Sequence, residues 1–119
     1  MRDDAFYLSH IRDAIGRIRV YSAGGRAAFF ADTLIQDAVM RNLEIIGEAA
    51  KHLTAAATDQ APHVPWRQIA GMRDVLIHHY FGIDMNTVWE VVEQHLAPLD
   101  TAVSQLLSPP GSSSSSTAP

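Results

Sequence analysis

The sequence predicts an all-α protein, an antiparallel bundle of four helices. Two observations support this class: apolar residues recur every three or four positions over most of the chain, and three breaks rich in glycine or proline divide that pattern. No stretch alternates apolar and polar residues as a half-buried strand does. Because the breaks are short, neighbouring helices are expected to run antiparallel. We expect one domain over residues 1–107.

The first two helices are predicted on either side of a glycine-rich break. The first covers about Asp4 to Val20, and Ser22-Ala23-Gly24-Gly25 ends it because paired glycines break helices. The second begins near Asp32, a good N-cap residue, and continues to about Leu53. The apolar stripes are Phe6, Leu8, Ile11, Ile15 and Ile18 in the first helix, and Ile35, Val39, Leu43, Ile46, Ala50 and Leu53 in the second.

Proline and glycine also delimit the other two helices. The third is predicted to start at Pro65-Trp66 and to extend to Phe81, with Gly82 as its C-cap. Asp84 can cap the fourth, and Pro98 lies inside it. Because proline removes a backbone hydrogen bond, we expect the fourth helix to be kinked or divided near Pro98. Its apolar residues are Met85, Val88, Trp89, Val92, Leu96, Leu99, Val103, Leu106 and Leu107.

Composition limits the sites and surroundings that this chain can have. The absence of cysteine excludes disulfides and thiolate metal sites. No apolar run approaches the roughly 20 residues of a membrane span, and Met1-Arg2-Asp3-Asp4 does not resemble a signal peptide. We therefore expect a cytoplasmic protein. A net charge of −4 disfavours broad binding to a phosphate backbone, so DNA is not expected as a partner. Residues 108–119, with five consecutive serines, are predicted to be disordered.

The third helix carries a polar cluster between Arg73 and Tyr80. Asp74 and His78 fall one turn apart on one face, so the carboxylate can accept a hydrogen bond from the imidazole and fix its tautomer. Arg73 and Tyr80 flank this face, and Tyr80 diverges from His78 on a straight helix. The three side chains can meet if the helix end deforms or if a second protomer contributes. In the structural alternative, Arg73 only forms an ion pair, and His78 and Asp74 only bond to each other within the fold. Tyr80 is then a core aromatic residue.

The segment from Pro65 to Phe81, in which R-x-x-x-x-H-x-Y runs from Arg73 to Tyr80, resembles the HepT-like branch of the HEPN ribonucleases. Residues 42–51, NLEIIGEAAK, resemble the same branch. The resemblance implies a dimeric endoribonuclease that needs neither a metal ion nor a cofactor, with an active cleft built from both protomers. It implies Arg73, His78 and Tyr80 as the site residues, with Arg73 and His78 catalytic and Tyr80 in support, and the position of Asp74 one turn before His78 adds it as a second supporting residue. The position after the arginine is commonly Asn in this branch, and here it is Asp74.

The resemblance also implies a role and a means of control. Such proteins are often the toxin of a toxin–antitoxin pair, encoded beside a small MNT-type nucleotidyltransferase that acts as antitoxin. Transfer of AMP to the motif tyrosine, here Tyr80, is the implied means of silencing. Two other functions stay open: a catalytically silent HEPN partner that docks the nucleotidyltransferase, and a structural bundle without catalysis.

The residue types suit RNA cleavage without a metal ion. Such cleavage needs a group that takes the 2′-hydroxyl proton, a cation for the phosphorane charge and a proton donor for the leaving oxygen. Histidine titrates near neutrality and can be acid or base, and the guanidinium fork matches phosphate oxygens. A dimer supplies two copies of each. The other histidines lack ligand spacing, and adjacent His78 and His79 point about 100° apart, so we predict no metal site.

Two further features of the second helix have structural interpretations. Glu44 and Glu48 share one face and are interpreted as helix-surface or interprotomer contacts. Gly47 costs roughly 1 kcal/mol relative to alanine in the middle of a helix. Its presence there predicts a close approach of another helix, within the bundle or across the dimer.

Overall fold

The computed structural model describes residues 3–108, and all the regular elements in this range are helical. The predicted all-α class is therefore confirmed. The segment expected to be disordered lies almost entirely outside the described residues, which end at Ser108. In chain order the elements are α1 Asp4–Tyr21, α2 Gly25–Ala31, α3 Thr33–Lys51, α4 Ala55–Thr58, α5 Trp66–His78, η1 Tyr80–Gly82, α6 Met85–Glu90, η2 Val91–His95 and α7 Leu96–Leu107.

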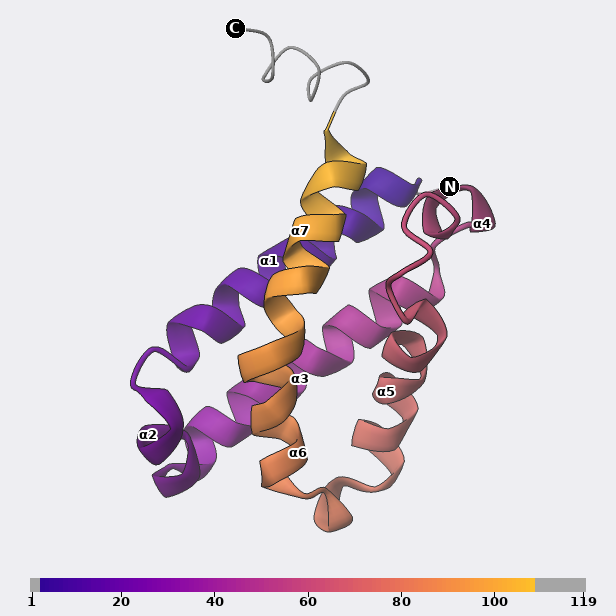
Figure 1. Cartoon of the computed structure of the whole chain (residues 1–119). Helices are drawn as coiled ribbons and strands as arrows, with labels where there is room; N and C mark the ends of the chain where they lie inside the picture. The colour runs from indigo at the N-terminus through magenta and orange to yellow at the C-terminus, as the bar shows by residue number, and fades with distance from the viewer. Residues whose placement is uncertain (1–2, 109–119) are drawn as a thin grey trace, which may run out of the picture.

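Helix α3 is the central element of the bundle. It packs against α1 on one side and against α5 on the other, while α7 packs on α1 (Figure 1). Helices α5 and α7 make few contacts with each other, and an apolar cavity of about 320 Å³ lies between α3, α5 and the η2–α7 segment. The largest fully buried side chains come from α1, α2, α3 and α7: Phe29, Ile11, Ile15, Ile18, Leu43, Ile46, Val39 and Val103.

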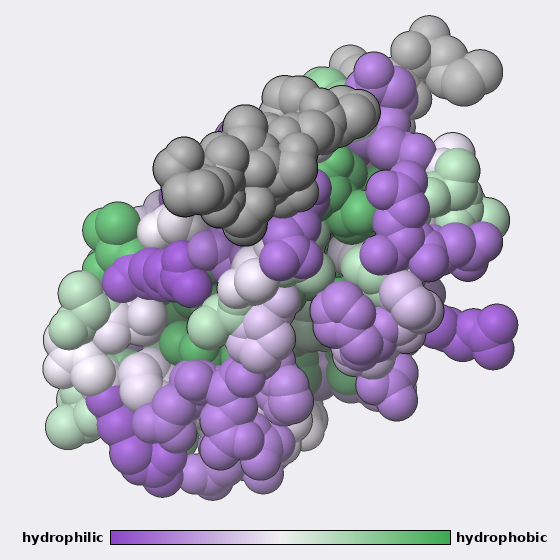
Figure 2. Space-filling view, turned by 45° about the horizontal axis from the view of Figure 1, so that its top comes forward, coloured by the Kyte–Doolittle hydropathy of each residue, from purple (hydrophilic) through white to green (hydrophobic). Residues whose placement is uncertain are grey.

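One polar side chain is part of the interface between α1 and α3. Asn42 is 5% exposed, and its side-chain oxygen accepts a 2.7 Å hydrogen bond from Arg17 Nε. Its amide nitrogen donates to the carbonyl of Ala38 at 2.8 Å. Because both its oxygen and its nitrogen are bonded, Asn42 is buried without leaving either atom unsatisfied. The face of the molecule shown in Figure 2 is largely hydrophilic, with apolar side chains visible in patches between polar ones.

The glycine-rich break ends α1 as predicted, but a helix that was not predicted follows it. Gly25 has φ of +87°, a left-handed conformation that favours glycine. The chain then forms α2, whose Phe29 is buried and lies 5.2 Å from the ring of Trp89. The N-cap role of Asp32 is confirmed, because its carboxylate accepts a 2.9 Å hydrogen bond from the backbone of Leu34. The four-residue helix α4 was also not predicted.

The third helix ends earlier than predicted, and the fourth is divided. Helix α5 stops at His78, and Tyr80–Gly82 form a separate 3-10 turn, so the expected C-cap role of Gly82 is wrong. Asp84 does cap α6. A π-helical segment, η2, separates α6 from α7 and ends at His95, shortly before Pro98. Residues 85–107 are helical without a break, so the missing N–H of Pro98 leaves a carbonyl in the preceding turn without its helical donor, and the π segment lies just upstream of this position.

Candidate active site

Arg73 lies where α5 comes closest to α3. A Cβ atom at Gly47 would be 2.9 Å from the backbone nitrogen of Arg73, and 3.0 Å from both Arg73 Cβ and the carbonyl oxygen of Ile69. Only glycine leaves room for this contact. The close approach predicted from Gly47 is confirmed, and it occurs between two helices of one chain. This contact brings the root of the Arg73 side chain next to the polar face of α3.

Two carboxylates hold the Arg73 guanidinium. Its Nε lies 2.7 Å from Glu48 Oε1 in an ion pair, and its Nη1 donates a 2.9 Å hydrogen bond to Asp74 Oδ1. Among residues 3–108 its Nη2 makes no hydrogen bond, so the N–H groups of that nitrogen are available to an anion. Glu48 is thus a helix-surface contact, one of the two alternatives predicted for it, and its partner Arg73 belongs to the same chain. The carboxylate helps to fix the direction of the guanidinium.

Glu48 is itself held by a second partner. Its Oε2 accepts a 2.9 Å hydrogen bond from His52 Nε2, one turn along α3. This bond lowers the pKa of Glu48 below its ordinary value, burial opposes the shift, and the positive charge of Arg73 adds to the lowering. The ring of Tyr7 stacks on His52 at 4.9 Å between centroids. Glu48 is thus ionised at neutral pH and connects Arg73 to α1.

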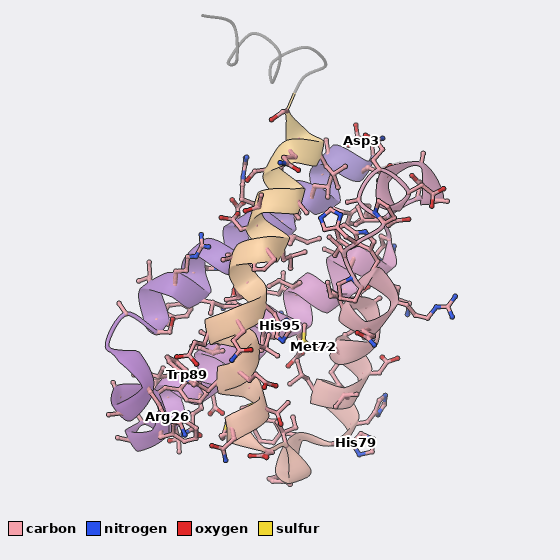
Figure 3. All side chains as sticks on the ribbon, viewed as in Figure 1. Asp3, Arg26, Met72, His79, Trp89 and His95 are labelled. Carbon is pink, nitrogen blue, oxygen red and sulfur yellow. The ribbon has the colours of Figure 1, made fainter. Side chains whose placement is uncertain are left out.

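His78 is the last residue of α5, and its side chain is exposed. The hydrogen bond expected between Asp74 and His78 is not observed, because the Asp74 carboxylate binds the adjacent Arg73 instead. Within the described range, His78 makes no hydrogen bond or ion pair with its side chain. Figure 3 shows the neighbouring His79 at the far end of α5, pointing away from the bundle.

Tyr80 makes a contact of its own with α3, separate from the contacts of Arg73. Its hydroxyl donates a 2.6 Å hydrogen bond to Asp37 Oδ1, in the first half of α3. This bond and the negative charge of Asp37 raise the pKa of the Tyr80 phenol above its ordinary value. Asp37 and Glu48 lie on the same face of α3, roughly 16 Å apart along its axis. Tyr80 and Arg73 therefore contact one edge of α3 at two separate points.

A cavity of about 340 Å³ lies beside Arg73. It opens between α1, α3 and α5, and Arg73 and Ile77 line its α5 side. His78 does not line it, because five residues along a helix turn a side chain by about 140° from Arg73. One chain therefore presents the arginine of the motif to this cavity without its histidine. The lining residues are Phe6, Tyr7, His10, Arg41, Glu44, Ile45, Glu48, Ala49, Arg73 and Ile77.

The apolar cavity between α5 and α7 has different chemistry. Met72 of α5 and His95 of η2 both face this space (Figure 3). Its other lining residues are mainly aliphatic, and neither Arg73 nor His78 reaches it. In the part of the chain that the structure describes, no group of three or more His, Asp or Glu side chains is placed to bind a metal ion. None of the described helices is both long and apolar enough to cross a membrane.

Comparison with known proteins shows which family and which proteins this chain is similar to. The family model described as "Ribonuclease HepT-like" matches residues 11–106. A Methanocaldococcus jannaschii protein, named as a gamma-glutamylcyclotransferase and a candidate RNase, is 38% identical over 107 residues, which are 89% of this chain. The chain spans about half of that relative, since the match covers 48% of it.

Two shorter relatives match over more of their own length. A protein from Caldanaerobacter subterraneus, named as a candidate RNase, is 42% identical over 79 residues, covering 66% of this chain and 70% of the relative. A "Probable ribonuclease HepT" from Thermococcus cleftensis is 41% identical over 97 residues, covering 78% of this chain and 86% of the relative. No solved structure shows significant similarity to this chain.

Proposed function

Since this chain belongs to the HepT-like ribonuclease family, we propose that it is an endoribonuclease that cleaves RNA at a site shared by two copies of the chain, without a metal ion. The observation that carries the shared site is the cavity beside Arg73, which lacks His78 of the same chain. A histidine from a second copy completes the pair of groups that the reaction needs. The homodimer is thus the active unit.

Arg73 supplies the positive charge of this site. Glu48 and Asp74 hold its Nε and Nη1, so Nη2 is directed by two contacts and meets a phosphate oxygen with little loss of side-chain freedom. A fixed guanidinium stabilises the charge that develops on the phosphorus-bound oxygens. His78 takes or gives the proton, and its exposure at the end of α5 lets it reach a neighbouring chain.

Control acts at Tyr80 in this proposal. The chain is the toxin of a cytoplasmic toxin–antitoxin pair, and an MNT-type nucleotidyltransferase silences it by transferring AMP to the Tyr80 hydroxyl. Tyr80 is 44% exposed, so a transferase can approach its side chain. Its partner Asp37 lies one turn before Arg41, which lines the cavity. An AMP group on Tyr80 therefore places a bulky anion near the cavity, where it competes with an RNA phosphate.

Cleavage of a single-stranded RNA by the purified protein in EDTA tests the activity. Arg73→Ala and His78→Ala should each lower the rate by roughly 10²- to 10⁴-fold and leave a folded dimer. Arg67→Ala, which removes an exposed arginine from the same helix, is the matched control and should retain activity. Loss of cleavage in EDTA that added Mg²⁺ restores would contradict the metal-independent reaction.

Complementation tests the shared site. Mixing Arg73→Ala chains with His78→Ala chains gives dimers in which one site keeps both an intact arginine and an intact histidine. Partial recovery of cleavage is expected if the two groups come from different chains. An inactive mixture, with exchange of chains verified by mass spectrometry, would mean that each chain works alone.

A silent binding partner is the second candidate, and one observation favours it. The Arg73 guanidinium is already neutralised by Glu48 and Asp74, so its attraction for RNA is reduced. A silent partner should bind the nucleotidyltransferase and cleave no RNA, and the activity assay in EDTA and in Mg²⁺ distinguishes the two.

A further inference from the structure

Asp37 makes a contact that RNA cleavage does not explain. It is exposed on the first half of α3, and its Oδ1 accepts the 2.6 Å hydrogen bond from the Tyr80 hydroxyl, 43 residues later in the chain. Within residues 3–108 this is the one hydrogen bond or ion pair that its side chain makes. A carboxylate is thus placed against a hydroxyl that the proposed function requires to act as a nucleophile.

We propose that Asp37 is the general base for nucleotidyl transfer to Tyr80. This inference rests on the proposed modification of that tyrosine. A nucleophile and its base must lie within about 2.6–3.2 Å of each other, and the observed 2.6 Å satisfies this. A carboxylate that accepts the proton of an attacking hydroxyl is also the arrangement that protein kinases use for phosphoryl transfer.

The chemical step balances with ATP as the co-reactant. The Tyr80 oxygen forms a bond to the α-phosphorus of ATP while the bond between that phosphorus and the pyrophosphate oxygen breaks. The hydroxyl proton passes to the Asp37 carboxylate and then to water. The products are the AMP ester of Tyr80 and pyrophosphate, and the nucleotidyltransferase supplies the bound ATP.

The environment of Tyr80 requires such a base. The hydrogen bond to Asp37 raises the pKa of the phenol, so the hydroxyl is protonated at neutral pH and must lose its proton as it attacks. Tyr7 and Tyr21, the other two tyrosines, are also among the described residues, and neither hydroxyl donates a hydrogen bond to a carboxylate. The base therefore also accounts for selection of Tyr80 over them.

A purely structural role for Asp37 predicts a different result. In that case the hydrogen bond only holds the turn η1 against α3. Asp37→Asn distinguishes the two roles, because the side-chain oxygen of asparagine still accepts the hydrogen bond but the amide does not take up the proton. A structural hydrogen bond is kept in this variant, whereas general-base catalysis is lost.

The experiment uses the full chain, [α-³²P]ATP, Mg²⁺ and an MNT-type nucleotidyltransferase. Initial rates of AMP incorporation are compared for the unmodified chain, Asp37→Asn, Asp37→Glu and Asp13→Asn, an exposed acid on α1 that serves as the matched control. Asp37→Asn should lower the rate by roughly 10²- to 10⁴-fold. Asp37→Glu should restore part of it, and Asp13→Asn should leave it unchanged. Mass spectrometry identifies the modified residue.

The possible failures are distinguishable. If the unmodified chain acquires no AMP, the proposed control at Tyr80 is wrong. If it is modified and Asp37→Asn is modified equally fast, Asp37 is not the general base, and its hydrogen bond only holds η1 against α3. If Asp37→Asn no longer binds the transferase in a pull-down assay, Asp37 is a docking residue, which also overturns the inference.

Discussion

The contact between Gly47 and α5 allows a quantitative prediction for Gly47→Ala. The added Cβ atom would lie 2.9 Å from Arg73 N and 3.0 Å from Ile69 O, and both of these are backbone atoms that cannot rotate away. Bringing the shortest contact to an ordinary 3.4 Å requires α3 and α5 to separate by about 0.5 Å. The perturbation thus acts directly on the backbone that carries Arg73.

Two opposing effects determine the free energy of unfolding. Alanine is favoured over glycine in a helix interior by about 1 kcal/mol, and overpacking a core costs about 1–3 kcal/mol. We therefore expect a net destabilisation of about 0–2 kcal/mol. RNA cleavage should respond more strongly, because a misplacement of about 1 Å can lower a rate by roughly 10²-fold. For a shift of half that size we expect a loss of about tenfold.

Gly71→Ala is the matched control. Gly71 lies on the same helix as Arg73, and a Cβ atom there would meet nothing within 4 Å. This substitution should stabilise the protein by about 0.4–1 kcal/mol and leave cleavage unchanged. Urea unfolding followed by circular dichroism measures stability, and cleavage of a labelled RNA measures activity. If Gly47→Ala is as stable and as active as Gly71→Ala, the close contact does not position Arg73.

Three further predictions concern Glu48, Asp74 and Tyr80. Glu48→Gln should lower cleavage by loosening Arg73, while thermal unfolding changes little because a half-exposed ion pair contributes about 0–1 kcal/mol. The pKa of Glu48 is lower in the folded chain than in the unfolded chain, so its ionised form stabilises the fold at neutral pH. That stabilisation is lost as the pH falls through and below 4.5. Glu48→Gln lacks the carboxylate, so its stability should fall less over this pH range than that of the unmodified chain. Asp74→Asn should strengthen RNA binding about fivefold in a filter-binding assay, because two like charges about 4 Å apart in water repel by about 1 kcal/mol; equal or weaker binding would show that Asp74 does not oppose the phosphate. Tyr80→Phe should take up no AMP when incubated with the nucleotidyltransferase and ATP, and an adduct on another residue in the mass spectrum would contradict the assignment.

The sequence predicted what depends on local patterns. Apolar spacing identified the long helices, and Asp32 and Asp84 identified two helix starts, because an N-cap acts within one turn. The short helices α2 and α4 were missed, since seven and four residues carry too little periodicity. Tertiary packing stabilises α2, because its Phe29 is buried against Trp89, which lies much later in the chain.

The motif residues were predicted from a resemblance, and their partners were not. Spacing on one helix suggested that Asp74 bonds to His78, but the permanent charge of the adjacent Arg73 attracts the carboxylate more strongly. The ion pair between Arg73 and Glu48 joins residues 25 positions apart, and the hydrogen bond from Tyr80 to Asp37 joins residues 43 positions apart. Such pairs depend on how α5 packs against α3, which no local pattern specifies.

The charge balance around Arg73 supports the proposed sharing of the site between two chains. With Glu48 and Asp74 both bound to the guanidinium, the three groups together carry a charge of −1, which repels a phosphate. Under the proposed function, binding of RNA at this cavity therefore needs additional positive charge nearby. Arg41 on α3 lines the cavity but is paired with Glu44 at 3.5 Å, so it adds little. In the proposed dimer, His78 of a second copy brings an imidazole to this cavity, and the group proposed for proton transfer would then also offset part of the negative charge around Arg73 whenever it carries a proton.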